Sequence, residues 1–275
     1  MLTLLKVYVK IYILQYYCKN LINAIGGSNM FLFGRKKGNK STKAETPTTT
    51  SAKVVLSKAE NGLERHLVRL KKDENIDLST HRARVFVVID RSYSMKELYL
   101  DGSVQEVLTR LLPLALKFDD NGELEVYVFN STCTKMSSMN LSNYENYVER
   151  EIILNGFFPT GGTSYSPVIK QTISDYNDES QYPAFGIFIT DGNNGDADET
   201  DRAIRESSKL KIFYQFVGIG PEKFEYLQKL DDLEGRDVDN TEFIRVSDFA
   251  HLDDEQLYEK LLEQYPQWLK AMKIN

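Results

Sequence analysis

The sequence predicts an α/β fold built around a mostly parallel β-sheet, and three observations indicate it. Residues 85–89 form an unbroken apolar run rich in β-branched side chains, and residues 185–189 form a second, largely apolar run. Such runs are typical of strands buried on both faces, as in a parallel sheet covered by helices. Stretches with helical spacing of apolar residues alternate with these and further short apolar runs, which is the pattern of βαβ units.

The expected strands are short apolar runs separated by stretches long enough to form a helix. We expect strands over residues 84–90, 124–129, 183–190, 212–219 and 243–246, with a short edge strand over residues 132–138.

The expected helices carry apolar residues at helical spacing, most clearly over residues 104–118. Pro113 lies inside that stretch and predicts a kink or a local break, and Pro266 predicts an interruption near the C-terminus. We expect helices over residues 104–118, 144–154, 166–176, 199–209 and 223–230, and a helical region over residues 254–272.

Small oxygen-bearing side chains follow two of the predicted strands. Asp90 ends the first strand, Ser92 and Ser94 follow it at alternate positions, and Asp191 directly follows the strand over residues 183–190. Thr163 follows two glycines in a third loop. Because ligands of open α/β sheets bind at the carboxyl ends of the strands, these side chains can converge there. Oxygen donors of this kind suit a hard cation such as Mg²⁺.

Each of these residues also has a purely structural interpretation. Thr163 could cap the helix that follows it, and Asp191-Gly192 could simply form a turn. The Asp-x-Ser-x-Ser stretch could likewise be a polar turn after a strand. The joint occurrence of all five residues in order at strand ends favours a metal site. By contrast, Asp196, Asp198 and Asp201 are expected to form a solvated loop face or helix N-terminal charges.

The ligand set Asp90, Ser92, Ser94, Thr163 and Asp191 resembles the metal-ion-dependent adhesion site of von Willebrand factor A (vWA) domains. The resemblance extends from residue 83 to the C-terminus, and all five ligand positions match. Residues 98–122 and 161–165 are most similar to the bacterial tellurium-resistance (Ter-type) vWA proteins. The resemblance implies a Rossmann-like three-layer sandwich with helices on both faces and an antiparallel edge strand over residues 132–138.

The resemblance also implies roles for the five residues. Ser92 and Ser94 coordinate Mg²⁺ through their hydroxyls, with Ca²⁺ or Mn²⁺ as alternative ions. Thr163 binds the ion directly in one state and through water in another, and Asp90 and Asp191 bind directly or through water. With only two carboxylates near it, the cation stays electrophilic enough to accept an Asp or Glu side chain from a protein partner.

The expected function is therefore a non-enzymatic, cation-dependent protein-binding module in a bacterial tellurite or stress-response system of the cytoplasm. The alternative is a Mg²⁺-dependent phosphatase or phosphotransferase of haloacid-dehalogenase type, which also places an Asp after its first strand. That chemistry needs a second Asp two residues later as general acid, where this chain has Ser92. A secreted adhesin is a third possibility, against which the absence of a clear signal peptide weighs.

Composition narrows the classes of partner. The chain carries a formal net charge of −6, but residues 1–53 alone carry +8, which leaves about −14 on the remainder. An acidic domain argues against nucleic-acid binding. Cys18 and Cys133 are the only cysteines, which is no disulfide framework and fits a reducing compartment.

The N-terminal third is expected to lie outside the main domain. Residues 26–30 back-translate to a purine-rich stretch before a Met codon, so we expect residues 1–29 to be translated leader and Met30 the true start. The alternative is an amphipathic membrane anchor, although no stable membrane insertion is expected. Residues 30–52 are expected to form a basic, disordered tail, residues 53–82 an extension packed on the vWA domain, with a break at Asn61-Gly62, and residues 83–275 the domain itself.

Overall fold

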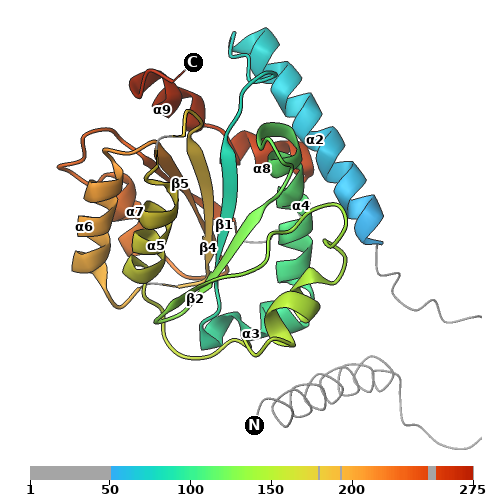
Figure 1. The fold of residues 1–275 in the computed structure, drawn as a ribbon, viewed down its shortest axis with the longest axis vertical. Helices are drawn as coiled ribbons and strands as arrows, with labels where there is room; N and C mark the ends of the chain where they lie inside the picture. Colours follow the sequence, from blue (N-terminus) through green and yellow to red (C-terminus); the bar gives the residue numbers. More distant parts are fainter. Residues whose placement is uncertain (1–50, 179, 193, 247–251, 275) are drawn as a thin grey trace, which may run out of the picture. The chain divides into compact units, whose positions relative to one another are not determined.

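The computed structural model describes residues 51–178, 180–192, 194–246 and 252–274, and these form one compact unit that begins at Ala52 (Figure 1). At its centre is a six-stranded sheet in the order β3-β2-β1-β4-β5-β6. The strands are β1 (Arg84–Asp90), β2 (Glu125–Phe129), β3 (Cys133–Lys135), β4 (Ala184–Thr190), β5 (Ile212–Ile219) and β6 (Thr241–Val246).

The pairing of the strands confirms the predicted fold class. β1 pairs in parallel with both β2 and β4, β4 pairs with β5, and β5 pairs with β6. Only β3 is antiparallel, and it lies at the sheet edge beside β2. The carboxyl ends of the five parallel strands therefore lie at one edge of the sheet. Both Asp90 and the loop after Thr190 are located at that edge.

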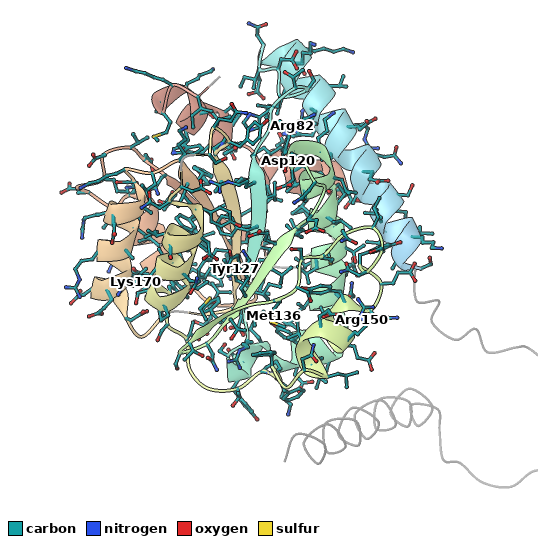
Figure 2. All side chains as sticks on the ribbon, viewed as in Figure 1. Arg82, Asp120, Tyr127, Met136, Arg150 and Lys170 are labelled. Atoms are coloured by element: carbon teal, nitrogen blue, oxygen red, sulfur yellow. The ribbon has the colours of Figure 1, made fainter. Side chains whose placement is uncertain are left out.

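One face of the sheet is covered by α5 (Ser166–Tyr176), α6 (Ala197–Ser207) and α7 (Glu225–Asp231) (Figure 1). Alternate strand residues such as Phe86 and Phe188 join apolar side chains of these helices in a continuous aromatic core. Tyr127 of β2 belongs to this core, and its side chain is labelled in Figure 2. The alternation follows from the pleat of a strand, which sends successive side chains to opposite faces.

The opposite face is covered by α4 (Ser103–Phe118), which is itself flanked by α2 (Ala52–Asp73) and α8 (Asp254–Leu261) (Figure 1). The last helix, α9 (Tyr265–Ala271), packs Tyr265 against Phe185 and Trp268 against Phe213. Three short elements complete the described fold: the 3₁₀ turn η1 (Tyr93–Met95), α3 (Lys96–Leu100) and the π-helical turn η2 (Val148–Ile153).

The local break expected at Pro113 and the break expected at Asn61-Gly62 are both absent, and each has its own physical reason. α4 runs through Pro113 without a break, and 11 of its 16 residues are buried, so packing offsets the hydrogen bond that proline removes. α2 runs through Gly62, where an added Cβ would lie 2.4 Å from the Cβ of Asp254. That glycine permits close approach of α2 to α8 and does not end the helix. The interruption expected near Pro266 is present, because Pro266 lies in the first turn of α9.

The expectations for the N-terminal segment lie mostly outside the described residues. The leader over residues 1–29 and nearly all of the tail over residues 30–52 fall in the undescribed stretch 1–50. Among the helices that the structure describes, none combines the length and apolar character needed to cross a bilayer.

The close approach of β1 and β4 gives the first prediction. Gly186 pairs with Phe86, and an added Cβ would lie 2.2 Å from Cζ of the Phe86 ring. We expect Gly186→Ala to lower the free energy of unfolding by about 1–3 kcal/mol, because the core is overpacked there. Urea unfolding measures it. Adding Phe86→Leu should restore part of the loss, whereas Gly162→Ala, where a Cβ meets nothing within 4 Å, should be nearly neutral. Wild-type stability for Gly186→Ala would contradict the packing described.

A second prediction concerns His81, which lies between the rings of Phe118 and Tyr265 and is hydrogen-bonded to the Tyr265 hydroxyl at 2.9 Å. Burial and the nearby Arg82 guanidinium lower the pKa of His81 to about 4 from 6.5. Between these values the unfolded state binds a proton that the folded state does not, so His81 destabilises the fold as the pH falls through this window. Chemical unfolding of His81→Gln from about pH 7 to 4.5 should show a shallower loss of stability than wild type. Equal slopes would rule out this role for His81.

Candidate metal centre

Asp90 is the last residue of β1, and its side chain is fully buried. Its Oδ1 accepts a hydrogen bond from the backbone N–H of Ser92 at 2.6 Å, and its Oδ2 accepts one from the Thr190 hydroxyl at 2.7 Å. The Tyr99 hydroxyl donates to the Asp90 backbone carbonyl at 3.1 Å. The first two bonds fix the carboxylate between the ends of β1 and β4, and the third joins the backbone of Asp90 to the end of α3.

Ser92, Ser94 and Asp191 form a continuous chain of polar contacts. The hydroxyl oxygens of Ser92 and Ser94 lie 3.1 Å apart, and the Ser94 hydroxyl donates to Oδ1 of Asp191 at 2.8 Å. Ser92 is buried, Asp191 half-buried and Ser94 exposed. The group therefore runs from the buried carboxylate of Asp90 out to solvent.

Thr163 lies on a loop that is bonded to the Asp90 loop through the backbone. The Tyr93 N–H donates to the Gly161 carbonyl at 3.2 Å, and the Thr160 N–H donates to the Arg91 carbonyl at 2.8 Å. Gly161 has φ 81°, which favours glycine at this turn. Thr163 is half-buried, and its hydroxyl forms no hydrogen bond among the residues that the structure describes. Four of the five predicted ligands thus share one hydrogen-bonded group, and the fifth, Thr163, lies on the adjoining loop.

Asp196 joins the loop that carries Thr163 to the loop that follows β4. The sequence analysis did not predict this contact. Its two carboxylate oxygens accept the backbone N–H groups of Tyr165 and Ser166, both at 2.9 Å. Burial opposes its charge, but these hydrogen bonds outweigh burial and lower the pKa of Asp196. The Gly195 N–H also donates to the Thr163 carbonyl at 2.8 Å. Asp196 is the N-cap residue of α6, in line with the charge expected at a helix N-terminus, but its carboxylate is hydrogen-bonded to the Thr163 loop, so the expected solvated position is wrong.

The electrostatics of the site favour a bound cation. Burial raises the pKa of Asp90 to about 6, and the Asp191 carboxylate adds to the rise. Burial also raises the pKa of Asp191. Among the described residues, neither carboxylate forms an ion pair with a lysine or arginine. A buried, unpaired carboxylate is costly unless a positive charge compensates it.

The donor chemistry fits Mg²⁺. The site offers two carboxylates and three hydroxyls, all oxygen donors, and leaves room for water or a further ligand. No cluster of three or more His, Cys, Asp or Glu that could hold a metal occurs in the described part of the chain. The fit therefore depends on the serine and threonine hydroxyls as much as on the acids. With an ion bound, Asp90, Ser92, Ser94, Thr163 and Asp191 are the residues that would hold it.

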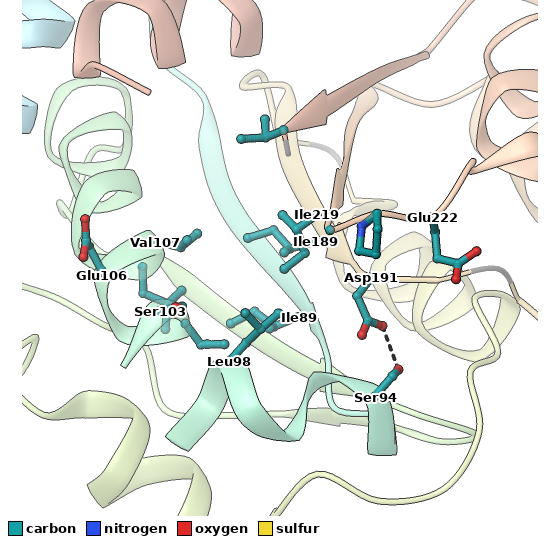
Figure 3. A pocket seen from close by; sticks show the side chains of 15 residues that line it. Ile89, Ser94, Leu98, Ser103, Glu106, Val107, Ile189, Asp191, Ile219 and Glu222 are labelled. Atoms are coloured by element: carbon teal, nitrogen blue, oxygen red, sulfur yellow. Dashed lines mark hydrogen bonds between the residues drawn. The ribbon is translucent and has the colours of Figure 1, made fainter. Parts of the chain in front are cut away.

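A cavity of about 540 Å³ adjoins this group (Figure 3). Ser94 and Asp191 line it at one end, and their hydrogen bond is drawn in Figure 3. Its interior is formed by apolar side chains at the ends of four strands and by the first half of α4. The strand residues are Ile89, Ile189, Ile219 and Val246.

Sequence reasoning missed two side chains that support the site. Thr190 precedes Asp191 and was assigned to the strand, although a hydroxyl at a strand end beside a predicted ligand is a signal that could have identified it. Tyr99 gave no such signal, because only the fold brings the end of α3 back against β1. The cavity could not be predicted either, since its walls come from elements distant in sequence.

Comparison with known proteins places the chain in a family. The sequence profile described as "vWA found in TerF C terminus" (vWA-TerF-like) matches residues 82–275. The uncharacterized protein YcbR of Bacillus subtilis (strain 168) is 40% identical over 203 residues, which covers 73% of this chain and 83% of YcbR.

Several solved structures resemble part of this chain at low sequence identity. A von Willebrand factor type A protein from Catenulispora acidiphila is 17% identical with a TM-score of 0.48, and the match covers 66% of this chain but only 42% of that protein. The manganese-loaded TRAP protein of Plasmodium vivax is 12% identical with a TM-score of 0.48, over 68% of this chain and 74% of that one. Identities this low concern the fold alone. The family profile shows that the chain belongs to the TerF-type von Willebrand factor A domains.

Proposed function

We propose that the protein is a divalent-cation-dependent protein-binding module, in which Asp90, Ser92, Ser94, Thr163 and Asp191 bind Mg²⁺ and the bound ion accepts an Asp or Glu of a partner. The observation that carries this is the buried Asp90 carboxylate, which has no cationic side chain paired with it among the described residues and is joined through the Ser92 backbone to a line of oxygen donors leading to solvent. Family membership supports the coarser statement, because vWA domains are known for protein–protein interaction.

The charge balance explains why an acidic partner is the expected one. Two carboxylates do no more than balance the formal charge of a dication, and the three hydroxyls add oxygen ligands without adding charge, so the ion itself would stay electrophilic. The ion would supply a positive centre at a position open to solvent beside Ser94. A partner carboxylate is the side chain that best complements such a centre. Ca²⁺ or Mn²⁺ could take the place of Mg²⁺, since both accept oxygen donors.

We propose a non-enzymatic role, in a bacterial tellurite or stress-response system of the cytoplasm. The match to the vWA domain found at the TerF C-terminus supports the assignment to a tellurite or stress-response system. The haloacid-dehalogenase alternative has no comparable support. Its general acid would stand at the position of Ser92, whose side-chain oxygen instead lies 3.1 Å from that of Ser94.

A stability measurement tests ion binding. Asp90→Asn keeps the shape of the side chain but removes a buried charge that Asp191 repels. We expect its melting temperature in chelator to equal or exceed that of wild type, and its stabilisation by Mg²⁺ to be lost. Wild type should gain about 2.7 kcal/mol at a Mg²⁺ concentration 100 times the Kd. Asp120→Asn changes an exposed acid of the turn after α4 and should behave as wild type. Equal Mg²⁺ stabilisation of Asp90→Asn and wild type would exclude this site.

Capture from extract of the native cell tests partner binding. We expect a protein retained by wild type and by Asp120→Asn in Mg²⁺, and released by chelator or by Asp90→Ala. Replacing the exposed acids of that protein by amides, one at a time, should then abolish capture at one position. A set of bound proteins that is indifferent to both the metal and Asp90 would rule out the proposed function.

A further inference from the structure

The cavity beside the metal site is a formed apolar chamber with buried walls. Ile89 and Ile189 from the strands and Val107 and Leu108 from α4 are each at most 4% exposed. Figure 3 shows the isoleucines of β1, β4 and β5 gathered opposite α4. A volume of about 540 Å³ lies within the range of pockets that hold ligands. The chamber is therefore large enough for a bulky side chain.

The polar end of this chamber coincides with the proposed metal site. Its acidic or hydroxyl-bearing lining residues that reach solvent are exposed Ser94, Glu106 and Glu222 and half-buried Ser103 and Asp191. Ser94 and Asp191 are also two of the five proposed ligands, joined by a hydrogen bond of 2.8 Å. A group bound to the ion at these two residues therefore stands next to the apolar interior.

The charges of the lining determine what can enter. Asp191, Glu106 and Glu222 are acidic, and no lysine, arginine or histidine is among the described lining residues. Glu106 and Glu222 lie on opposite sides of the chamber (Figure 3). An anionic ligand is repelled by this lining unless a cation is bound at Asp191. A neutral apolar group faces no such barrier.

We propose that the chamber receives a bulky apolar side chain of the partner, adjacent in its sequence to the acidic residue that binds the metal. The recognised motif is then an Asp or Glu next to a residue such as Leu or Phe. This inference rests on the proposed function and specifies it. The carboxylate requires the cation, and the apolar neighbour adds affinity and selectivity by burial against the isoleucine-lined walls.

Three capped tetrapeptides test the inference by NMR titration of the full-length protein, with saturating Mg²⁺ and with chelator. Their central pairs are Asp-Leu, Asp-Ala and Asn-Leu. With Mg²⁺ we expect Asp-Leu to bind about tenfold more tightly than Asp-Ala, since three more carbons are buried and part of that gain is lost in ordering the side chain. Asn-Leu should bind far more weakly, and chelator should abolish the binding of Asp-Leu.

Leu98→Trp tests the chamber itself. Leu98 is half-buried on α3 and lines the chamber, so a larger side chain can narrow it with little strain. We expect this variant to bind Asp-Ala as wild type does and to lose the advantage of Asp-Leu. Val107→Phe, which fills the chamber from α4, should do the same. Leu141→Trp is the matched control, because Leu141 is 56% exposed and does not line the chamber.

The outcomes separate the two proposals. Equal Mg²⁺-dependent binding of Asp-Leu and Asp-Ala would overturn the inference and leave the proposed function standing. Equal binding of Asp-Leu and Asn-Leu, with or without Mg²⁺, would show an apolar site without metal recognition and would overturn the inference. Absence of binding by all three peptides while Mg²⁺ itself shifts the signals of the site would overturn both the inference and the acceptance of a partner carboxylate.

Discussion

Burial of the Asp90 carboxylate at the end of the central strand is the constraint around which the loops of this domain are arranged. β1 lies between two parallel neighbours, so its last residue is placed in the interior. Two hydrogen bonds, from the Ser92 N–H and the Thr190 hydroxyl, stabilise the charge there. Two hydrogen bonds compensate only part of the cost of burying a carboxylate. The remainder is the physical reason for expecting a cation at this point.

The same constraint explains the bonding between the three loops. The Asp90 loop is joined to the Thr163 loop through Tyr93 and Gly161, and the Thr163 loop is joined to the segment after Asp191 through Gly195 and Asp196. All of these contacts engage backbone groups or a carboxylate at a helix start. The hydroxyls of Ser94 and Thr163 remain at the accessible side of the group. The loops are thus held together mainly through backbone groups, so the oxygen atoms of the serine and threonine hydroxyls can still serve as ligands of an ion.

Much of this could be predicted from the sequence, because both the strands and the ligands carry local signals. The apolar run before Asp90 specifies a doubly buried strand, and the spacing of Ser92 and Ser94 specifies a polar loop at its end. The continuity of α4 through Pro113 could not be predicted, since it depends on packing against elements distant in sequence. The hydrogen bonds of Asp196 to Tyr165 and Ser166 could not be predicted for the same reason, because these partners are some 30 residues away. The local sequence pattern identifies the oxygen-bearing side chains that could bind a metal. Tertiary contacts determine which of these side chains already form hydrogen bonds within the protein.

The choice of hydroxyls over further carboxylates bears on stability as well as on binding. A third carboxylate would make the site bind a cation more tightly, but it would be repelled by Asp90 and Asp191 in the free protein. It would also reduce the net positive charge that the bound ion presents to a partner. Hydroxyls complete the donor set at smaller cost to the free protein. The acidic residues Glu106 and Glu222 stand further out, at the exposed lining of the chamber, where solvent screens them. Within the site, the fully buried charge is that of Asp90, at a position where a bound ion would neutralise it.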